Sequence, residues 1–385
     1  MSTIDPFNQR ASRRRFLGFG AIGLGALAAT VMGCGSGDSE TGTPVATPPA
    51  TSGATAGTAA TATSTVTAAA STANGQASAK ALAAAEAFIA TLDASQKAVV
   101  VAERTQANLS QWSNLPEQAF QRAGIRLDSL SPDQKTAVNG ILAAALSPEG
   151  LTQVTQITTA DGVLATTSTG SNPGFGADKY WIRFIGTPSA NAPWTIQYGG
   201  HHLAVNVTVA GARMTHAPTL WGAQPALYSQ GGTSVEPLSG ETTKAFALMN
   251  ALDATQQTAA TLTTQVREIM LGAGQDGKTL AAEGVKSSTF TAAQKQALLA
   301  LVQEWLRPLN EENAAAKVTT AEAEVDQMTF AWNGATTIGQ PIYYRVQSPT
   351  FVIEFAHQRQ GNSGDVSHIH SIYREIGNDY GAKLA

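Results

Sequence analysis

Cysteine is almost absent from this chain of 385 residues, which contains only Cys34. A single thiol cannot form an intramolecular disulfide or a thiolate metal cluster, so neither holds this protein together. Charged residues are also few, at 14% of the chain. Lys and Arg total 24 against 28 Asp and Glu, and this balance does not favour the clustered cations that bind phosphate groups. We therefore expect no nucleic acid partner.

Two common catalytic signatures are also missing. The glycine-rich segments lack the lysine and the flanking elements of a phosphate-binding loop. No G-x-S-x-G elbow precedes a predicted helix. The sequence therefore gives no support to nucleotide binding through such a loop or to serine hydrolase chemistry.

The first 33 residues are typical of an export signal. Residues 12–17 have the sequence SRRRFL, which resembles the twin-arginine signal S-R-R-x-F-L. Residues 16–32 carry no charge and are too few for a bilayer-spanning helix, which needs about 20. We expect export to the periplasm or to the cell surface. The alternative is a membrane anchor that is retained.

Cys34 ends this uncharged segment, in the sequence VMGC at residues 31–34. The segment resembles a bacterial lipobox, in which the thiol is acylated and becomes the mature N-terminus. Met32 departs from the pattern, because a smaller residue is usual there. The alternative is cleavage after residue 28, which leaves an odd free cysteine. We expect a lipid on Cys34 that anchors the protein to a membrane.

Residues 41–79 contain neither a charged nor an aromatic side chain and consist mostly of Thr, Ala, Ser, Gly and Pro. Such a segment cannot bury enough apolar surface to offset the entropy of ordering it. We therefore predict a lipidated, disordered tether over 34–79 and a globular domain over 80–385. Loss of residues 1–33 leaves a formal net charge of −7, which again argues against nucleic acid.

Segments of the globular domain recur at a spacing of 160 residues. Ser or Thr precedes Gln-Lys and a 3.6-residue apolar period in both copies of one segment, which predicts a helix with an N-cap. We predict two similar halves, 80–240 and 241–385. The recurring pairs are TLDASQK at 91–97 with ALDATQQ at 251–257, SPDQK at 131–135 with TAAQK at 291–295, and Gly124-Ile125 with Gly284-Val285.

After each helical block the apolar period changes from 3.6 to 2, which indicates strands. Each half then consists of a helical block and a three-stranded segment. We predict an α+β fold whose halves are related by a pseudo-twofold axis. The alternative is two unrelated domains. The predicted strands are 180–185, 194–198 and 201–209 in the first half, and 342–346, 351–355 and 368–374 in the second.

The six histidines all lie between positions 201 and 370, and four of them form two close pairs. These pairs are His201-His202 and His368-x-His370. Neutral imidazole is the commonest ligand for borderline metals, so the pairing indicates a metal site. The remaining two stand alone and are expected to be ordinary core or surface residues: His216 and His357.

The two histidine pairs differ in whether a regular strand lets both side chains bind the same metal ion. Residues i and i+2 share a face, so His368 and His370 can bind one atom together. Only one of His201 and His202 can join them unless the backbone is irregular, which the two glycines before them permit. Three nitrogen ligands with an open position are typical of a catalytic metal. The alternative is that the imidazoles bond backbone carbonyls or nearby acids.

Three further residues are candidates for the chemistry. Matching the second strands of the halves places Glu354 where the first half has Gln197, so Glu354 is a candidate fourth ligand or general base. Arg374 and Tyr373 follow the second histidine pair and are candidates for orienting a substrate.

Three motifs resemble a bacterial and fungal family known as domain-of-unknown-function family 3500. The motifs are W-x-x-Q-x-G-G-H-H-L-x-x-N at 194–206, P-x-x-W-G-A-Q-P at 218–225, and H-x-H-x-x-Y-R-x-x-x-N-D-Y-G at 368–381. The resemblance covers about residues 80 to 385. It implies that both histidine motifs belong to one domain, and it implies no activity.

The leading hypothesis is a metal-dependent enzyme that is exported and tethered to a membrane. Its metal is a divalent transition ion, zinc, copper or iron, and its reaction is hydrolytic or oxidative. Its substrate is a small or extracellular molecule. The rival hypothesis is a surface lipoprotein that binds a metal or a ligand without catalysis, and a third is a purely structural surface protein. The sequence alone does not decide whether the protein is an enzyme.

Overall fold

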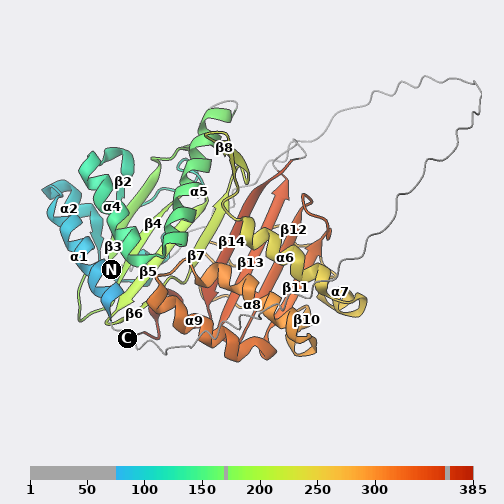
Figure 1. The fold of residues 1–385 in the computed structure, drawn as a ribbon. Helices are drawn as coiled ribbons and strands as arrows, with labels where there is room; N and C mark the ends of the chain where they lie inside the picture. The colour runs from blue at the N-terminus through green and yellow to red at the C-terminus, as the bar shows by residue number, and fades with distance from the viewer. Residues whose placement is uncertain (1–74, 169–171, 360–364, 385) are drawn as a thin grey trace, which may run out of the picture. The chain divides into compact units, whose positions relative to one another are not determined.

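The computed structural model describes residues 75–168, 172–359 and 365–384 (Figure 1). The expected export signal, the lipid site Cys34 and most of the predicted tether lie outside these residues. Helix α1 begins at Gln76, so the last residues assigned to the tether belong to the folded unit. The helices are α1 (Gln76–Ala90), α2 (Ala94–Val100), α3 (Gln106–Leu109), α4 (Pro132–Ala145), α5 (Pro148–Thr167), α6 (Ser239–Ala251), α7 (Ala254–Ala260), α8 (Ala292–Leu306) and α9 (Glu311–Glu324), with 3-10 turns η1 (Leu127–Ser129), η2 (Ser287–Thr289), η3 (Val325–Gln327) and η4 (Asp379–Gly381).

None of the helices in these described ranges combines the length and the apolarity that crossing a membrane requires.

A sheet of twelve strands runs through the folded unit in the order β1-β3-β4-β5-β7-β14-β13-β12-β11-β10, with β2 beside β3 and β6 beside β5. Its pairings are antiparallel except that of β1 with β3. Helices and strands are thus mixed, as the predicted α+β class requires. The strands are β1 (Val101–Ala102), β2 (Ile125–Arg126), β3 (Tyr180–Ile185), β4 (Trp194–Gly200), β5 (Leu203–Ala210), β6 (Arg213–Thr215), β7 (Thr219–Ala223), β10 (Val285–Lys286), β11 (Thr329–Gly334), β12 (Ile342–Gln347), β13 (Phe351–Arg359) and β14 (Val366–Glu375), and a separate hairpin contains β8 (Tyr228–Gln230) and β9 (Thr233–Val235).

The helix starts predicted from the repeat are confirmed, and both halves build them in the same way. Helices α4 and α8 each begin with a capping box, in which Ser131 or Thr291 bonds reciprocally with the glutamine three residues later. Those glutamines, Gln134 and Gln294, also donate from Nε2 to a carbonyl at the end of α1 or α6, at 3.1 and 2.8 Å. Each box therefore ties two helices together.

The predicted strand match is displaced by one strand. Strand β3 pairs with β2 and β4, and the strand with equivalent partners is β11, which pairs with β10 and β12. The predicted match omits β11 and aligns β3 with residues of β12. By pairing, β4 corresponds to β12 and β5 to β13, and their first residues, Trp194 and Ile342, Leu203 and Phe351, are 148 apart. A pseudo-twofold relation between the halves stays a prediction.

The two faces of the sheet are covered differently. Helices α5, α6 and α8 lie in front of the sheet in Figure 1, and helical side chains join the sheet in the main hydrophobic core. On the other face, Trp112 and Leu271 pack with Ile372 in a smaller core. These two residues come from long connections that we call the first covering loop, residues 103–124, and the second covering loop, residues 262–284.

Buried polar side chains of the sheet hold both covering loops by their backbones. Arg183 and Gln197 donate to carbonyls of the first covering loop at 2.6 and 3.1 Å. Arg345 and Arg374 donate to carbonyls of the second at 2.9 and 2.7 Å. Because a buried guanidinium or amide without partners is costly, these bonds fix the loops against the sheet.

Candidate functional site

Strand β7 lies between β5 and β14 and brings the two histidine pairs together. It places Gly222 opposite His370 on β14, and its other edge pairs with β5. The Gly222 N–H donates to the carbonyl oxygen of His202 at 2.7 Å. A Cβ atom on Gly222 would lie 2.6 Å from the carbonyl oxygen of Ile369, so this close approach of chains requires glycine.

His201 and His202 form the two-residue turn between β4 and β5. Gly200 pairs with Leu203 across the turn, so the prediction that the strand begins at residue 201 is wrong. His202 has φ 62°, which is uncommon for a residue with a side chain. Its N–H donates to the Asn114 carbonyl at 3.2 Å, and this bond and the contact with β7 offset the strain. The irregular backbone lies at the histidines themselves.

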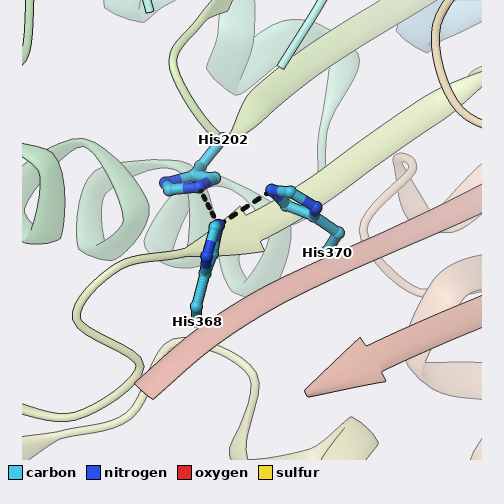
Figure 2. Close-up of side chains that lie close together, drawn as sticks. All are labelled: His202, His368 and His370. Atoms are coloured by element: carbon cyan, nitrogen blue, oxygen red, sulfur yellow. Dashed lines mark hydrogen bonds between the residues drawn. The ribbon is translucent and has the colours of Figure 1, made fainter. Parts of the chain in front are cut away.

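Three imidazole nitrogens converge at this point, in what we call the histidine cluster: His202, His368 and His370 (Figure 2). The Nε2 atom of His368 lies 2.8 Å from Nε2 of His202 and 3.0 Å from Nε2 of His370. A neutral imidazole has one N–H, so His368 can donate to at most one of these neighbours, and lone pairs are left facing one another. The ligand atoms of all three lie within 4.8 Å of one another, so this group can hold a metal ion.

Glu268 of the second covering loop orients His370. Its Oε2 atom lies 2.8 Å from Nδ1 of His370 and accepts a hydrogen bond from Nε2 of Gln358 at 2.9 Å. Partial burial works to raise the pKa of Glu268, but its hydrogen bonds, first of all that with His370, outweigh burial and leave the pKa lowered. An ionised carboxylate at Nδ1 holds the proton there, so Nε2 of His370 carries the lone pair. That lone pair faces the cluster and also the side-chain amide of Asn114, whose Nδ2 lies 3.2 Å away.

Asp161 on α5 makes a similar contact with His201. Its Oδ1 atom lies 2.6 Å from Nδ1 of His201, and its Oδ2 atom accepts from the Gly176 N–H at 2.9 Å. The His201 ring stacks on Phe175 with centroids 4.6 Å apart, and it lies 3.6 Å from the ring of His202. Asp161, His201 and His202 also bring their ligand atoms within 4.8 Å, so a second group that can hold a metal shares His202.

Burial favours the neutral form of His201, His202 and His368. Desolvation, followed by the charges of neighbouring imidazoles, lowers the pKa of His368 to about 3 and holds the pKa of His202 well below its usual value. Burial also lowers the pKa of His201, although Asp161 acts in the opposite direction. Because metals bind neutral imidazole, His202 and His368 offer the lone pairs that a metal needs at neutral pH.

Glu354 is not in either group. It is fully buried on β13, where its oxygens accept hydrogen bonds from the backbone N–H groups of 270–271, the shortest at 2.7 Å, and from the Tyr343 hydroxyl at 2.6 Å. By strand pairing its counterpart in the first half is Asn206, not Gln197. These bonds give Glu354 the task of holding the second covering loop. Its role as a ligand or base stays an untested prediction.

Arg374 and Tyr373 lie on opposite faces of β14. The Arg374 guanidinium bonds carbonyls of the second covering loop, Asp276 at 2.9 Å and Asp379 at 2.6 Å. Tyr373 is buried in the main core and donates to Glu375 at 3.0 Å. These contacts give Arg374 and Tyr373 structural tasks, and the orientation of a substrate by either stays a prediction.

The two lone histidines are both buried, as expected for core residues. Sequence reasoning missed Asp161 and Glu268, which contact histidines 40 and 102 residues away along the chain. No local spacing relates partners so distant, so the sequence holds no signal that marks these two carboxylates among the others.

Comparison with known proteins identifies a family without a known activity. Residues 74–382 match the family model described as Protein of unknown function (DUF3500). No curated protein and no solved structure matches the chain. The match includes both histidine motifs and covers most of the sequence. The chain therefore belongs to the DUF3500 family of proteins of unknown function.

Proposed function

We propose that His202, His368 and His370 bind a divalent transition metal, and that the protein is a metal-dependent enzyme. The observation that carries this proposal is the approach of three Nε2 atoms at 2.8 and 3.0 Å. Glu268 supports it, because a carboxylate at Nδ1 is the usual partner of a metal-binding imidazole. Three protein nitrogens leave a coordination position open, as catalytic zinc sites do.

Bound zinc would activate water at this site, whereas copper or iron would supply oxidative chemistry. His201 is the side chain best placed to accept a proton there, since its ring lies 3.6 Å from the ring of His202. Asp161 holds the Nδ1 side of that ring at 2.6 Å, which leaves Nε2 as the acceptor. We therefore propose His201 as a general base alongside the earlier candidate Glu354, whose role stays a prediction.

The burial of the cluster favours a second candidate, a lipoprotein that binds a metal without catalysis. His202 is 1% exposed and His370 is 7% exposed, so a substrate reaches the centre only through the partly exposed His368. Turnover of a candidate substrate that is abolished by a chelator and restored by metal would exclude this candidate.

Metal analysis of the purified full chain tests the proposal. We expect about one bound metal per chain, and we expect His368→Ala and His370→Ala to remove most of it. His216→Gln is the matched control, because His216 is buried in the core and bonds the Trp305 carbonyl at 2.6 Å. The metal is counted per mole of folded chain, so that unfolding is not mistaken for a lost ligand. Absence of metal from the folded wild-type chain would contradict the proposal.

Export and tethering are proposed from the sequence, since residues 1–74 lie outside the described ranges. Cys34 is the only thiol and ends the uncharged segment of the signal. Cys34→Ala should therefore release the protein from membranes without changing its fold. Sedimentation of the variant with membranes, or a mature chain that begins at Ala29, would contradict lipidation.

We also propose that the halves are related by a pseudo-twofold axis. The matched capping boxes at a spacing of 160 and the matched strands at 148 support this relation. An experimental structure in which the two halves fail to superpose over these elements would contradict it.

A further inference from the structure

A cavity of about 510 Å³ opens at the ends of β11, β12 and β13, beside the second covering loop. This volume lies within the range of about 300–1,000 Å³ that is usual for small-molecule sites. Its polar lining consists of two arginines, three amides and one histidine: Arg267, Arg359, Gln265, Asn333, Gln358 and His357.

The permanently charged side chains that line the cavity are both positive. Arg267 and Arg359 both line the cavity, and neither aspartate nor glutamate is among its described lining residues. Guanidinium groups match carboxylate and phosphate oxygens with paired hydrogen bonds. The lining therefore favours a ligand that carries an oxyanion.

His357 adds a second requirement. Its side chain is 8% exposed, and its Nε2 atom has no hydrogen-bond partner among the described residues. The ring bonds the backbone of Val366, and burial lowers the pKa of His357 to about 4, so the ring is neutral at neutral pH. A neutral ring that donates from one nitrogen accepts at the other, so Nε2 fits a hydroxyl of the ligand. The three amides of the lining also suit hydroxyl groups.

The cavity is connected to the histidine cluster by two hydrogen bonds. Gln358 lines the cavity and donates to Glu268 at 2.9 Å, and Glu268 contacts Nδ1 of His370 at 2.8 Å. Gln358 also stands directly opposite His368 in the pairing of β13 with β14. The cavity is therefore linked to the proposed metal centre through Gln358 and Glu268, although none of the three cluster imidazoles is among its described lining residues.

We propose that this cavity binds a small hydroxylated organic anion, in which Arg267 and Arg359 hold the carboxylate or phosphate and His357 accepts from a hydroxyl. The inference rests on the proposed function, because it names the substrate class of that centre.

Calorimetric titration of the metal-loaded full chain tests the inference with four probes. Gluconate and glucose 6-phosphate carry both required features, with a carboxylate and a phosphate respectively. Glucose lacks the anion, and hexanoate lacks the hydroxyls. We expect one or both hydroxylated anions to bind, and glucose and hexanoate to bind at least about ten-fold more weakly, since each loses a set of charge-assisted or buried hydrogen bonds. Whichever of the two anions binds more tightly shows whether the cavity prefers a carboxylate or a phosphate.

Variants separate the cavity from a nonspecific charge effect. The double variant Arg267→Gln, Arg359→Gln should weaken binding of the preferred anion by about ten-fold or more. Arg307→Gln is the matched control, because Arg307 is exposed and bonds only its helix neighbour Gln303 among the contacts described for it. His357→Phe should weaken binding too, and the arginine variants, which change exposed residues, decide the matter if that buried variant fails to fold. Unchanged binding in the double variant would overturn the inference.

The same titrations distinguish this inference from the proposed function. The arginine variants should retain the wild-type metal content, whereas His370→Ala should lose metal. Anion binding that persists in folded, metal-free wild-type chain would leave the cavity proposal standing even if the metal proposal fails. If neither hydroxylated anion binds better than glucose, the cavity proposal is contradicted and the metal proposal is not affected.

Discussion

On the loop-covered face of the sheet, the first half pairs Gln197 with Asn206, whereas the second half pairs Arg345 with Glu354 at matching register positions. Gln197 donates to Asn206 at 2.8 Å and to the first covering loop, and Glu354 accepts from the second. A neutral pair and an ionisable pair therefore perform the same structural task. The charge of the second pair is thus no sign of a catalytic role.

The histidines do not follow this correspondence. His201 and His202 stand in the turn before β5, whereas His368 and His370 lie within β14, and the counterpart of β5 is β13. Each half contributes ligand atoms to the cluster from a different part of its own architecture. The candidate metal site thus lies where the halves differ and meet, and the features they share hold its supporting loops.

The largest expected effect is a difference in metal content between variants of His201 and of His202, the two residues of the turn. His202→Ala should remove most bound metal, as should changes of the β14 pair, because its Nε2 lies 2.8 Å from that of His368. His201→Ala should retain metal but lose turnover, because its Nδ1 is held by Asp161. Metal analysis and a chelator-sensitive activity assay on both variants measure this difference. Equal loss of metal from both variants would mean that the two rings act as a pair of ligands.

The next effect concerns stability in acid. Burial lowers the pKa of His216 to about 4, against about 6.5 in the unfolded chain. Between these values the unfolded chain binds a proton that the folded chain does not. The free energy of unfolding should therefore fall by about 3 kcal/mol for this group as the pH drops from about 6.5 to about 4. Urea unfolding of the metal-free wild type and of His216→Gln should show a shallower pH slope in the variant, and identical slopes would contradict it.

A smaller effect distinguishes the two carboxylates behind the histidines. Glu268→Gln should weaken metal binding by about 10- to 100-fold, because the neutral amide no longer fixes the tautomer of the ligand His370. Asp161→Asn should change metal affinity less and shift the pH profile of activity instead, since it acts on His201. Competition with a metal indicator measures the affinities. A larger loss of affinity in Asp161→Asn would move the metal toward the group that contains Asp161 and His201.

The smallest effect tests the structural task of Glu354. Glu354→Gln should lower the free energy of unfolding by about 1–2 kcal/mol, because the new amide donor faces the backbone donors of the second covering loop. Glu283→Gln is the matched control, since that side chain is 56% exposed in its pair with Arg345 and should change stability by less than about 1 kcal/mol. Urea unfolding measures both. A variant of Glu354 with full stability and no activity would restore its catalytic role.

Sequence patterns predicted the features that depend on local order. The capped helices follow from Ser131 and Thr291, and the class of the fold follows from the change of apolar period. The match of strands was wrong because it omitted β11. The spacing between equivalent residues of the two halves changes from 160 to 148 just before that strand. The histidines were found because imidazole is rare in this chain. Glu268 and Asp161 were not, because only the folded sheet brings them to the site.

The central claim is that three imidazoles from both halves bind one metal ion. X-ray absorption spectroscopy of the metal-loaded full chain measures this directly. For zinc we predict three imidazole nitrogens at about 2.0–2.1 Å from the metal. In the His202→Ala variant, any metal that is still bound should have one imidazole fewer. A first shell with fewer than two imidazoles, or one unchanged in His202→Ala, would contradict the account.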